Sequence, residues 1–122
     1  MLMILTLVGS LAQGTAVTLP STPQGKVVAA FVTAFRAGEP AFLNFQEQHM
    51  LSGQKRTLEE RKAMYARMRK NFGDFKFRAV RSASAEQITL AVAHAEGEEA
   101  AFTFRFESAA PYRITEIAVE VE

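Results

Sequence analysis

The chain of 122 residues carries 14 Lys and Arg against 13 Asp and Glu, which gives a formal net charge of +1. A chain of this length forms one domain, and the nearly balanced charge gives no support to a nucleic-acid-binding protein, in which a strongly basic face is expected. There is no cysteine, which excludes a disulfide framework, a thiolate nucleophile and a cysteine-ligated metal site.

The first twelve residues have the pattern of an export signal. An apolar run over residues 2–8 is followed by small residues at Ser10 and Ala12, which resemble a signal-peptidase site with cleavage after Ala12. The run is too short to span a bilayer as a mature helix. The pattern predicts a signal peptide over residues 1–12, a flexible lead-in over 13–21, and a secreted or periplasmic protein without a membrane span. The alternative for the first segment is a core strand or helix.

Two helices are predicted at the start of the folded domain. Thr22 has the chemistry of an N-cap, and the proline that follows it suits the first helical position. Gly38 is suited to the end of this helix, and the second helix opens at Glu39-Pro40. The second helix ends near Met50, before a predicted turn at Ser52-Gly53.

A third helix is predicted from Thr57 to about Asn71. Thr57 and Glu60 have the spacing of a capping box, in which each side chain satisfies a backbone N–H of the other residue. Gly73 ends the helix. Apolar residues recur at helical spacing in all three helices. The predicted inner positions are Val27, Val28, Phe31, Val32, Phe35, Phe42, Phe45, Leu58, Arg61, Tyr65, Met68 and Phe72.

Four strands are predicted after the helices. Apolar and polar residues alternate with a period of two within residues 74–83, 86–97, 98–108 and 112–122, and turn residues separate these runs. Short connections between consecutive strands favour an antiparallel meander. The sequence therefore predicts a single α+β domain over residues 22–122, with three N-terminal helices packed on one face of a curved four-stranded antiparallel sheet.

The last strand contains one break in its alternation. Ile114 and Ile117 both have to face the core, although they are three positions apart and a regular strand would place them on opposite faces. A β-bulge near Thr115-Glu116 is predicted to correct the register.

Three segments resemble a known family. They are the start at Thr22-Pro23 with its apolar helices, the Phe72-Gly73 junction into the first strand, and the Pro111-Tyr112-Arg113-Ile114 start of the last strand. Together they are similar to an NTF2-like, or SnoaL-like, α+β cone. They are similar in particular to the N-terminal accessory domain of secreted beta-lactamase-like and tail-specific-protease-like serine hydrolases.

The resemblance covers residues 22–122 and specifies fold better than chemistry. Where that domain has an N-x-G-D type turn, this chain has Arg36-Ala37-Gly38-Glu39. No hydrolase domain follows Glu122 in this sequence, so the resemblance carries over no catalytic residue. The chain is expected to be a stand-alone copy of the accessory domain or a fragment of a larger hydrolase.

Five residues are candidates for a site, because NTF2-like cones often hold a pocket between helices and sheet. The catalytic candidates are His94, Tyr65 and Asp74, and the ligand-binding candidates are Tyr65, Arg61, His49 and His94. Each also has a structural interpretation. His49 suits a helix C-terminus, Arg61 can cover apolar surface with its stem, Asp74 suits a turn, and Tyr65 suits a core with its hydroxyl at the rim.

No metal or cofactor is expected, since the two histidines are far apart and have no carboxylate at ligand spacing. The basic stretch over residues 55–70 is interpreted as a solvated helix face, with a surface for an anionic partner or a membrane as the alternative.

The predicted function is that of an exported, non-catalytic accessory domain that binds a partner protein, such as a serine hydrolase, or a small apolar ligand. Small side chains on the exposed sheet face would let a second sheet approach closely, and they predict a homodimer through the sheet. These residues are Thr89, Ala91, Ala93, Thr103 and Ala118. The alternative is a small SnoaL-like lyase, isomerase or hydrolase that uses His94 or Asp74 with Tyr65.

Overall fold

The computed structural model describes residues 19–73, 76–93 and 98–121. Its helices and strands are, in chain order, α1 (Pro23–Ala37), α2 (Glu39–His49), α3 (Ser52–Lys55), α4 (Leu58–Phe72), β1 (Lys76–Ala83), β2 (Gln87–Ala93), β3 (Glu99–Phe106) and β4 (Ile114–Val121). The predicted α+β order of three helices and four strands is confirmed. The segment at Ser52-Gly53, predicted as a turn, instead begins the one-turn helix α3. The predicted signal peptide lies outside the described residues.

The helix boundaries follow the chemistry of their caps. The Thr22 side chain accepts a hydrogen bond of 3.1 Å from the Gly25 N–H at the start of α1. Thr57 and Glu60 form the predicted capping box of α4, with contacts of 2.9 and 3.1 Å. Gly38 separates α1 from α2 with a φ of 124°, a backbone conformation that residues with a Cβ rarely adopt.

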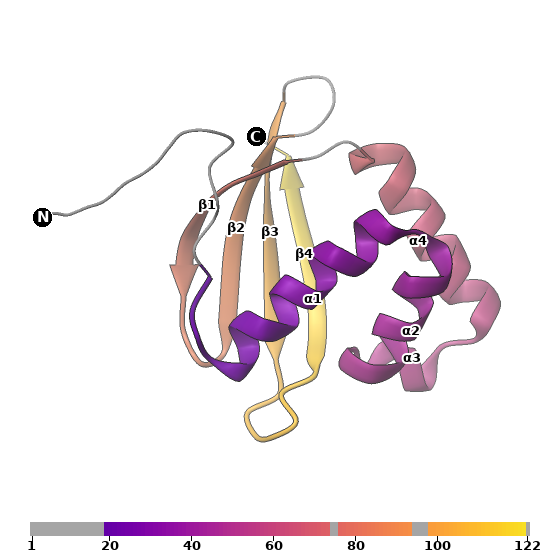
Figure 1. Ribbon diagram of the computed structural model, residues 1–122, viewed down its shortest axis with the longest axis horizontal. Coiled ribbons are helices and arrows are strands. Elements are labelled where there is room, and N and C mark those ends of the chain that lie inside the picture. The colour runs from indigo at the N-terminus through magenta and orange to yellow at the C-terminus, as the bar shows by residue number, and fades with distance from the viewer. Residues whose placement is uncertain (1–18, 74–75, 94–97, 122) are drawn as a thin grey trace, which may run out of the picture.

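The four strands form one open antiparallel sheet in the order β1-β2-β3-β4. Figure 1 shows α1 crossing one face of this sheet, which we call the inner face, while α2, α3 and α4 gather on the side of β4. The side chains of Ile88, Leu90 and Phe102 lie on the inner face and are fully buried. The opposite, outer face carries small and polar residues, as the alternation predicts.

Register shifts interrupt both edge strands. Arg105 pairs with Glu116, whereas the next residue of β3, Phe106, pairs with Ile114. Thr115 is therefore the extra residue, and the predicted bulge in β4 is confirmed. Strand β1 contains two further shifts, in which Arg78 and Arg81 are the inserted residues.

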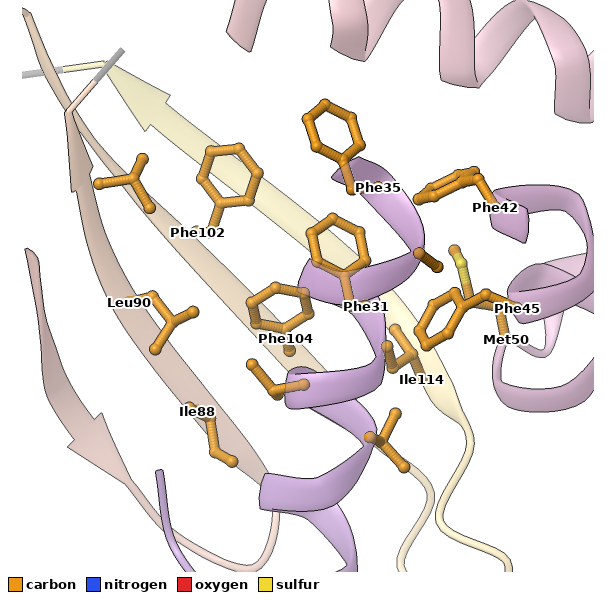
Figure 2. Packing of buried hydrophobic residues seen from close by; sticks show 14 of the residues in the cluster. Phe31, Phe35, Phe42, Phe45, Met50, Ile88, Leu90, Phe102, Phe104 and Ile114 are labelled. Carbon is orange, nitrogen blue, oxygen red and sulfur yellow. The ribbon is translucent and has the colours of Figure 1, made fainter. Parts of the chain in front are cut away.

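The layer between the helices and the sheet is filled with aromatic rings. Phe31 of α1 has no exposed surface, and its ring lies 5.7 Å from Phe42, 5.7 Å from Phe45 and 5.0 Å from Phe104, each in an edge-to-face arrangement. This geometry matches the preferred orientation of aromatic pairs. Figure 2 shows that Phe31 projects from α1 between the rings of α2 and those of β3. One side chain thus joins the helical half of the domain to the sheet.

The helices do not cover the inner face completely. Val119 and Val121 share register with Phe102 and Ala100 on this face, yet they keep 38 % and 58 % of their surface exposed. Leu58 was predicted at an inner position of α4 and is 45 % exposed, so that prediction is wrong. Leu58 is the first residue of α4. It precedes Arg61, which contacts α2 through the Leu43 carbonyl oxygen.

Candidate functional site

A surface groove with a volume of about 400 Å³ lies between α1 and α2. It is open to solvent and lies among small side chains, with one aromatic ring and a few polar groups at its border. The residues that line it are Ala29, Ala30, Thr33, Ala34, Ala37, Ala41, Asn44, Phe45, Gln48 and His49. The volume falls within the range of small-molecule sites, which is about 300–1,000 Å³.

The groove follows from the alanine content of α1. Four of its lining residues, Ala29, Ala30, Ala34 and Ala37, come from this one helix, and alanine is the best helix former. Because these side chains end at Cβ, the surface between α1 and α2 stays hollow where larger residues would fill it. The helical spacing of the large apolar residues of α1 gives no sign of this groove, whereas its run of alanines does.

His49 forms part of the border of this groove. It is the last residue of α2 and is half-buried, and its ring lies 5.1 Å from the ring of Phe45. Of the ligand-binding candidates that the structure describes, His49 is the one placed beside the groove. Asn44 and Gln48 of the same helix are exposed next to it. This end of the groove therefore offers hydrogen-bonding groups beside an apolar floor.

Tyr65 lies in the core and its hydroxyl group is already engaged. The residue keeps 7 % of its surface exposed, and the hydroxyl donates a hydrogen bond of 3.1 Å to the Phe35 carbonyl oxygen. Its ring lies 4.9 Å from Phe42 and 5.7 Å from Phe35. This geometry is that of a structural tyrosine, which ties α4 to the end of α1.

Arg61 is buried at the interface between α4 and α2. Its Nη1 donates to the Leu43 carbonyl oxygen at 3.4 Å and to the Glu47 carboxylate at 3.3 Å. The Glu47 side chain is 59 % exposed, so solvent screens this ion pair and its contribution to stability is small. The Arg61 Nε is buried and has no hydrogen-bond partner among the described residues.

Gln46 is the second buried polar residue of this interface. It has no exposed surface, and its Nε2 lies 3.5 Å from the Met64 sulfur, a weak acceptor. Its Oε1 has no partner in the described part of the chain. The interface between α2 and α4 therefore holds an orphaned acceptor and an orphaned donor.

The predicted site residues are not brought into one cluster by any described contact. His49 contacts Phe45, Tyr65 contacts α1 and α2, and Arg61 contacts α2, but no hydrogen bond or ring contact joins these three residues to one another within the described ranges. Asp74 and His94, the remaining candidates, lie outside the described residues. The pairing of Tyr65 with either of them stays a prediction.

The perturbed carboxyl group of the described chain lies in the loop between β3 and β4. The Arg113 side chain donates to the Glu107 carboxylate at 3.0 and 3.1 Å, and the Arg113 backbone N–H donates to it at 2.9 Å. These hydrogen bonds hold the pKa of Glu107 below its usual value and raise the pKa of Arg113. Because Glu107 and Arg113 lie at the two ends of this loop and bind each other, the pKa shifts indicate a structural ion pair.

The described residues contain no group of three or more His, Asp or Glu side chains that could hold a metal ion. In the same residues, none of the helices has the length and apolar character that crossing a membrane requires. A scan against protein-family models, a search of curated proteins and a search of solved structures each found no match for this chain. The similarity to NTF2-like domains therefore stays a prediction from the sequence.

Proposed function

We propose that this chain is a non-catalytic binding domain, and that the groove between α1 and α2 receives a small apolar ligand or an apolar side chain of a partner protein. The groove carries this proposal, because it combines an alanine floor with the ring of Phe45 and with hydrogen-bonding groups at one end. Apolar walls with a few polar groups are typical of small-molecule sites. The Tyr65 hydroxyl directs its proton to the Phe35 carbonyl oxygen, which argues against Tyr65 as the proton donor of the alternative enzyme.

The groove can be tested by filling it. Thr33 is exposed and lies within the groove, so Thr33→Trp places a large ring there without changing the core. We expect titration calorimetry with 1-octanol to detect binding to the unmodified chain, and we expect the heat to be lost in this variant. Lys26→Trp is the matched control, because Lys26 is an exposed residue of α1 outside the groove lining. Octanol binding that is equal in all three proteins would contradict the proposal.

A homodimer through the outer face of the sheet is part of the same proposal. Register places the predicted residues Thr89, Ala91, Ala93, Thr103 and Ala118 on this face, together with Ala79, Ser82 and Ala101. Ala91 was predicted to be exposed, but Ala91 and Ala101 keep only 5 % and 6 % of their surface exposed. These side chains are small enough for a second sheet to pack at about 10 Å. Sedimentation equilibrium should detect dimers, and Thr103→Lys should dissociate them, whereas Ser108→Lys in the exposed loop should not. A monomer at all concentrations would remove the dimer from the proposal.

Export and a serine hydrolase partner complete the proposal, and both are supported by the sequence alone. The apolar run over residues 2–8 and the small residues at Ser10 and Ala12 support export. Expression of the full chain in a bacterial host, followed by N-terminal sequencing of the secreted form, should give a chain that begins at Gln13. Retention of an intact chain in the cytoplasm would contradict the export part and leave the groove unaffected.

A further inference from the structure

We propose that the outer edge of β4 accepts an extended segment of a partner protein in which basic and apolar residues alternate. The segment would extend the sheet by one strand beside residues 116–121. This inference deepens the proposed function, because it names the chemistry of a partner. It concerns a surface separate from the groove, so the strand-pairing inference and the groove proposal can be refuted independently.

The backbone of β4 is available for this pairing over most of its length. β4 is an edge strand that pairs with β3 alone in the sheet. At its first residue the outer edge is covered, because the Leu51 N–H donates to the Ile114 carbonyl oxygen at 2.9 Å and Met50 forms a bridge to Ile114. From Glu116 to Val121 no backbone hydrogen bond to the outer edge is present among the described residues. Six residues at about 3.3 Å each give an edge of about 20 Å, on which every second residue directs its N–H and C=O groups outward.

The side chains beside this edge divide by face. On the inner face, Val119 and Val121 are exposed to 38 % and 58 % because no helix covers them. On the outer face, Glu116 and Glu120 are both exposed. Side chains of a pairing strand alternate between the two faces. The segment that fits therefore places apolar side chains beside the valines and basic side chains beside the glutamates.

Glu120 is the more available of the two carboxylates. Glu116 already contacts Arg105 at 3.0 Å. Glu120 lies opposite Ala101 in the register of the sheet, and no ion pair of Glu120 is present within the described ranges. Opposite charges on neighbouring strands stabilise pairing by roughly 0.2–1 kcal/mol per pair. A basic residue opposite Glu120 would gain this contribution.

A second copy of β4 is a poor occupant of this edge. Two antiparallel copies in the register centred on Ala118 would place Glu116 directly opposite Glu120 of the second copy. The register centred on Glu120 would place that residue opposite itself. Like charges directly opposite each other on neighbouring strands are destabilising. The register centred on Val119 places Glu120 opposite Ala118, where it gains no ion pair. A basic residue opposite Glu120 does gain one, so a basic partner is favoured over self-pairing.

Strand β1 of a second copy is also a poor occupant of the β4 edge. β1 has the required alternation in sequence from Lys76 to Ala79 only, with Arg78 as its second basic residue. However, Arg78 and Arg81 are inserted residues at two register shifts, and such bulges interrupt the regular ladder that a new strand needs. A segment of a different protein, free to stay extended, fits the edge of β4 better.

The test uses three fluorescein-labelled peptides of seven residues. The first alternates lysine and valine, the second has the same composition with all lysines at one end, and the third alternates glutamate and valine. We expect the first peptide to bind the full chain by fluorescence anisotropy and the other two to bind at least tenfold more weakly. Equal binding of the first two peptides would overturn the inference, because it would indicate charge attraction without strand pairing.

The location is tested by charge reversal and by hydrogen exchange. Glu120→Lys should weaken binding of the lysine–valine peptide about fivefold or more and should allow the glutamate–valine peptide to bind. The control Glu86→Lys makes the same charge change in the exposed turn between β1 and β2 and should leave binding unchanged. Backbone amides within residues 116–121 should exchange more slowly when the first peptide is present. Unchanged exchange, or slow exchange in a peptide-free dimer, would overturn the inference.

Failure of this inference is distinguishable from failure of the groove. Thr33→Trp should abolish octanol binding and leave peptide binding intact, whereas Glu120→Lys should weaken binding of the lysine–valine peptide and leave octanol binding intact. Loss of both activities in either variant would contradict the separation of the two surfaces.

Discussion

Replacing Gln46 with methionine should stabilise the domain. Gln46 has no exposed surface, its Oε1 has no partner among the described residues, and its Nε2 makes one contact, of 3.5 Å, to the Met64 sulfur. Burying a polar group without compensation costs about 1–3 kcal/mol in mutational data. Gln46→Met keeps an unbranched side chain of similar length and removes this cost. We expect the free energy of unfolding to rise by about 1 kcal/mol, which raises the melting temperature of a domain of this size by about 4 °C.

Urea unfolding and thermal melting, both followed by circular dichroism, measure this change. Gln48→Met is the matched control, because Gln48 lies on the same helix and is exposed, and it should change stability by less than about 0.5 kcal/mol. A loss of stability of about 1 kcal/mol or more in Gln46→Met would refute the reasoning. It would mean that Oε1 is hydrogen-bonded to a buried water molecule or to a bound ligand.

The remaining predictions concern three other contacts. Tyr65→Phe should lower the free energy of unfolding by about 1–2 kcal/mol, because it removes the buried hydrogen bond from Tyr65 to the Phe35 carbonyl oxygen. Octanol binding should not change, and lost binding at intact stability would assign Tyr65 to a site. Gly53→Ala should cost about 2–3 kcal/mol in urea unfolding, because the new Cβ would meet the Gln46 carbonyl group; a neutral effect would contradict this close approach. Arg113 lowers the pKa of Glu107, so the pair should stabilise the fold above the usual carboxyl pKa of about 4.3 and lose this contribution as the pH falls through the lowered value. The melting temperature of Glu107→Gln should therefore depend less on pH below about 5 than that of the unmodified chain, and parallel curves would count against this assignment.

The fold could be predicted because its local signals agree with one another. The capping box at Thr57 and Glu60, Gly38 between the first two helices and the change of period after the third helix are all short-range patterns, and the structure confirms them. The bulge at Thr115 could also be predicted, because Ile114 and Ile117 both pack on the core side and a regular strand would place them on opposite faces. Each of these features depends on a few neighbouring residues.

The candidate surfaces are places that the packed helices and sheet leave uncovered. Short-range sequence patterns do not show where these places lie. The groove exists because α1 and α2 meet where their side chains are small. Val119 and Val121 fit the inner-face alternation, but the helices stop short of them. Tyr65 was a candidate for a pocket donor, and only the position of the Phe35 carbonyl oxygen revealed how its hydroxyl group is used. Predicting these features requires the relative placement of helices and sheet.

The two unlike edges of the sheet also limit how far the chain can polymerise. A strand-paired fibre needs each molecule to accept one strand and to offer another, because growth continues only through two compatible ends. Here β4 offers a regular edge over residues 116–121, beyond its bulge at Thr115, whereas the shifts at Arg78 and Arg81 interrupt the edge of β1. Each molecule therefore has one sheet edge that can accept a further strand, and assembly through the edges stops after one strand has been added. An interrupted edge of this kind is one of the ways in which sheet proteins limit aggregation through their edges.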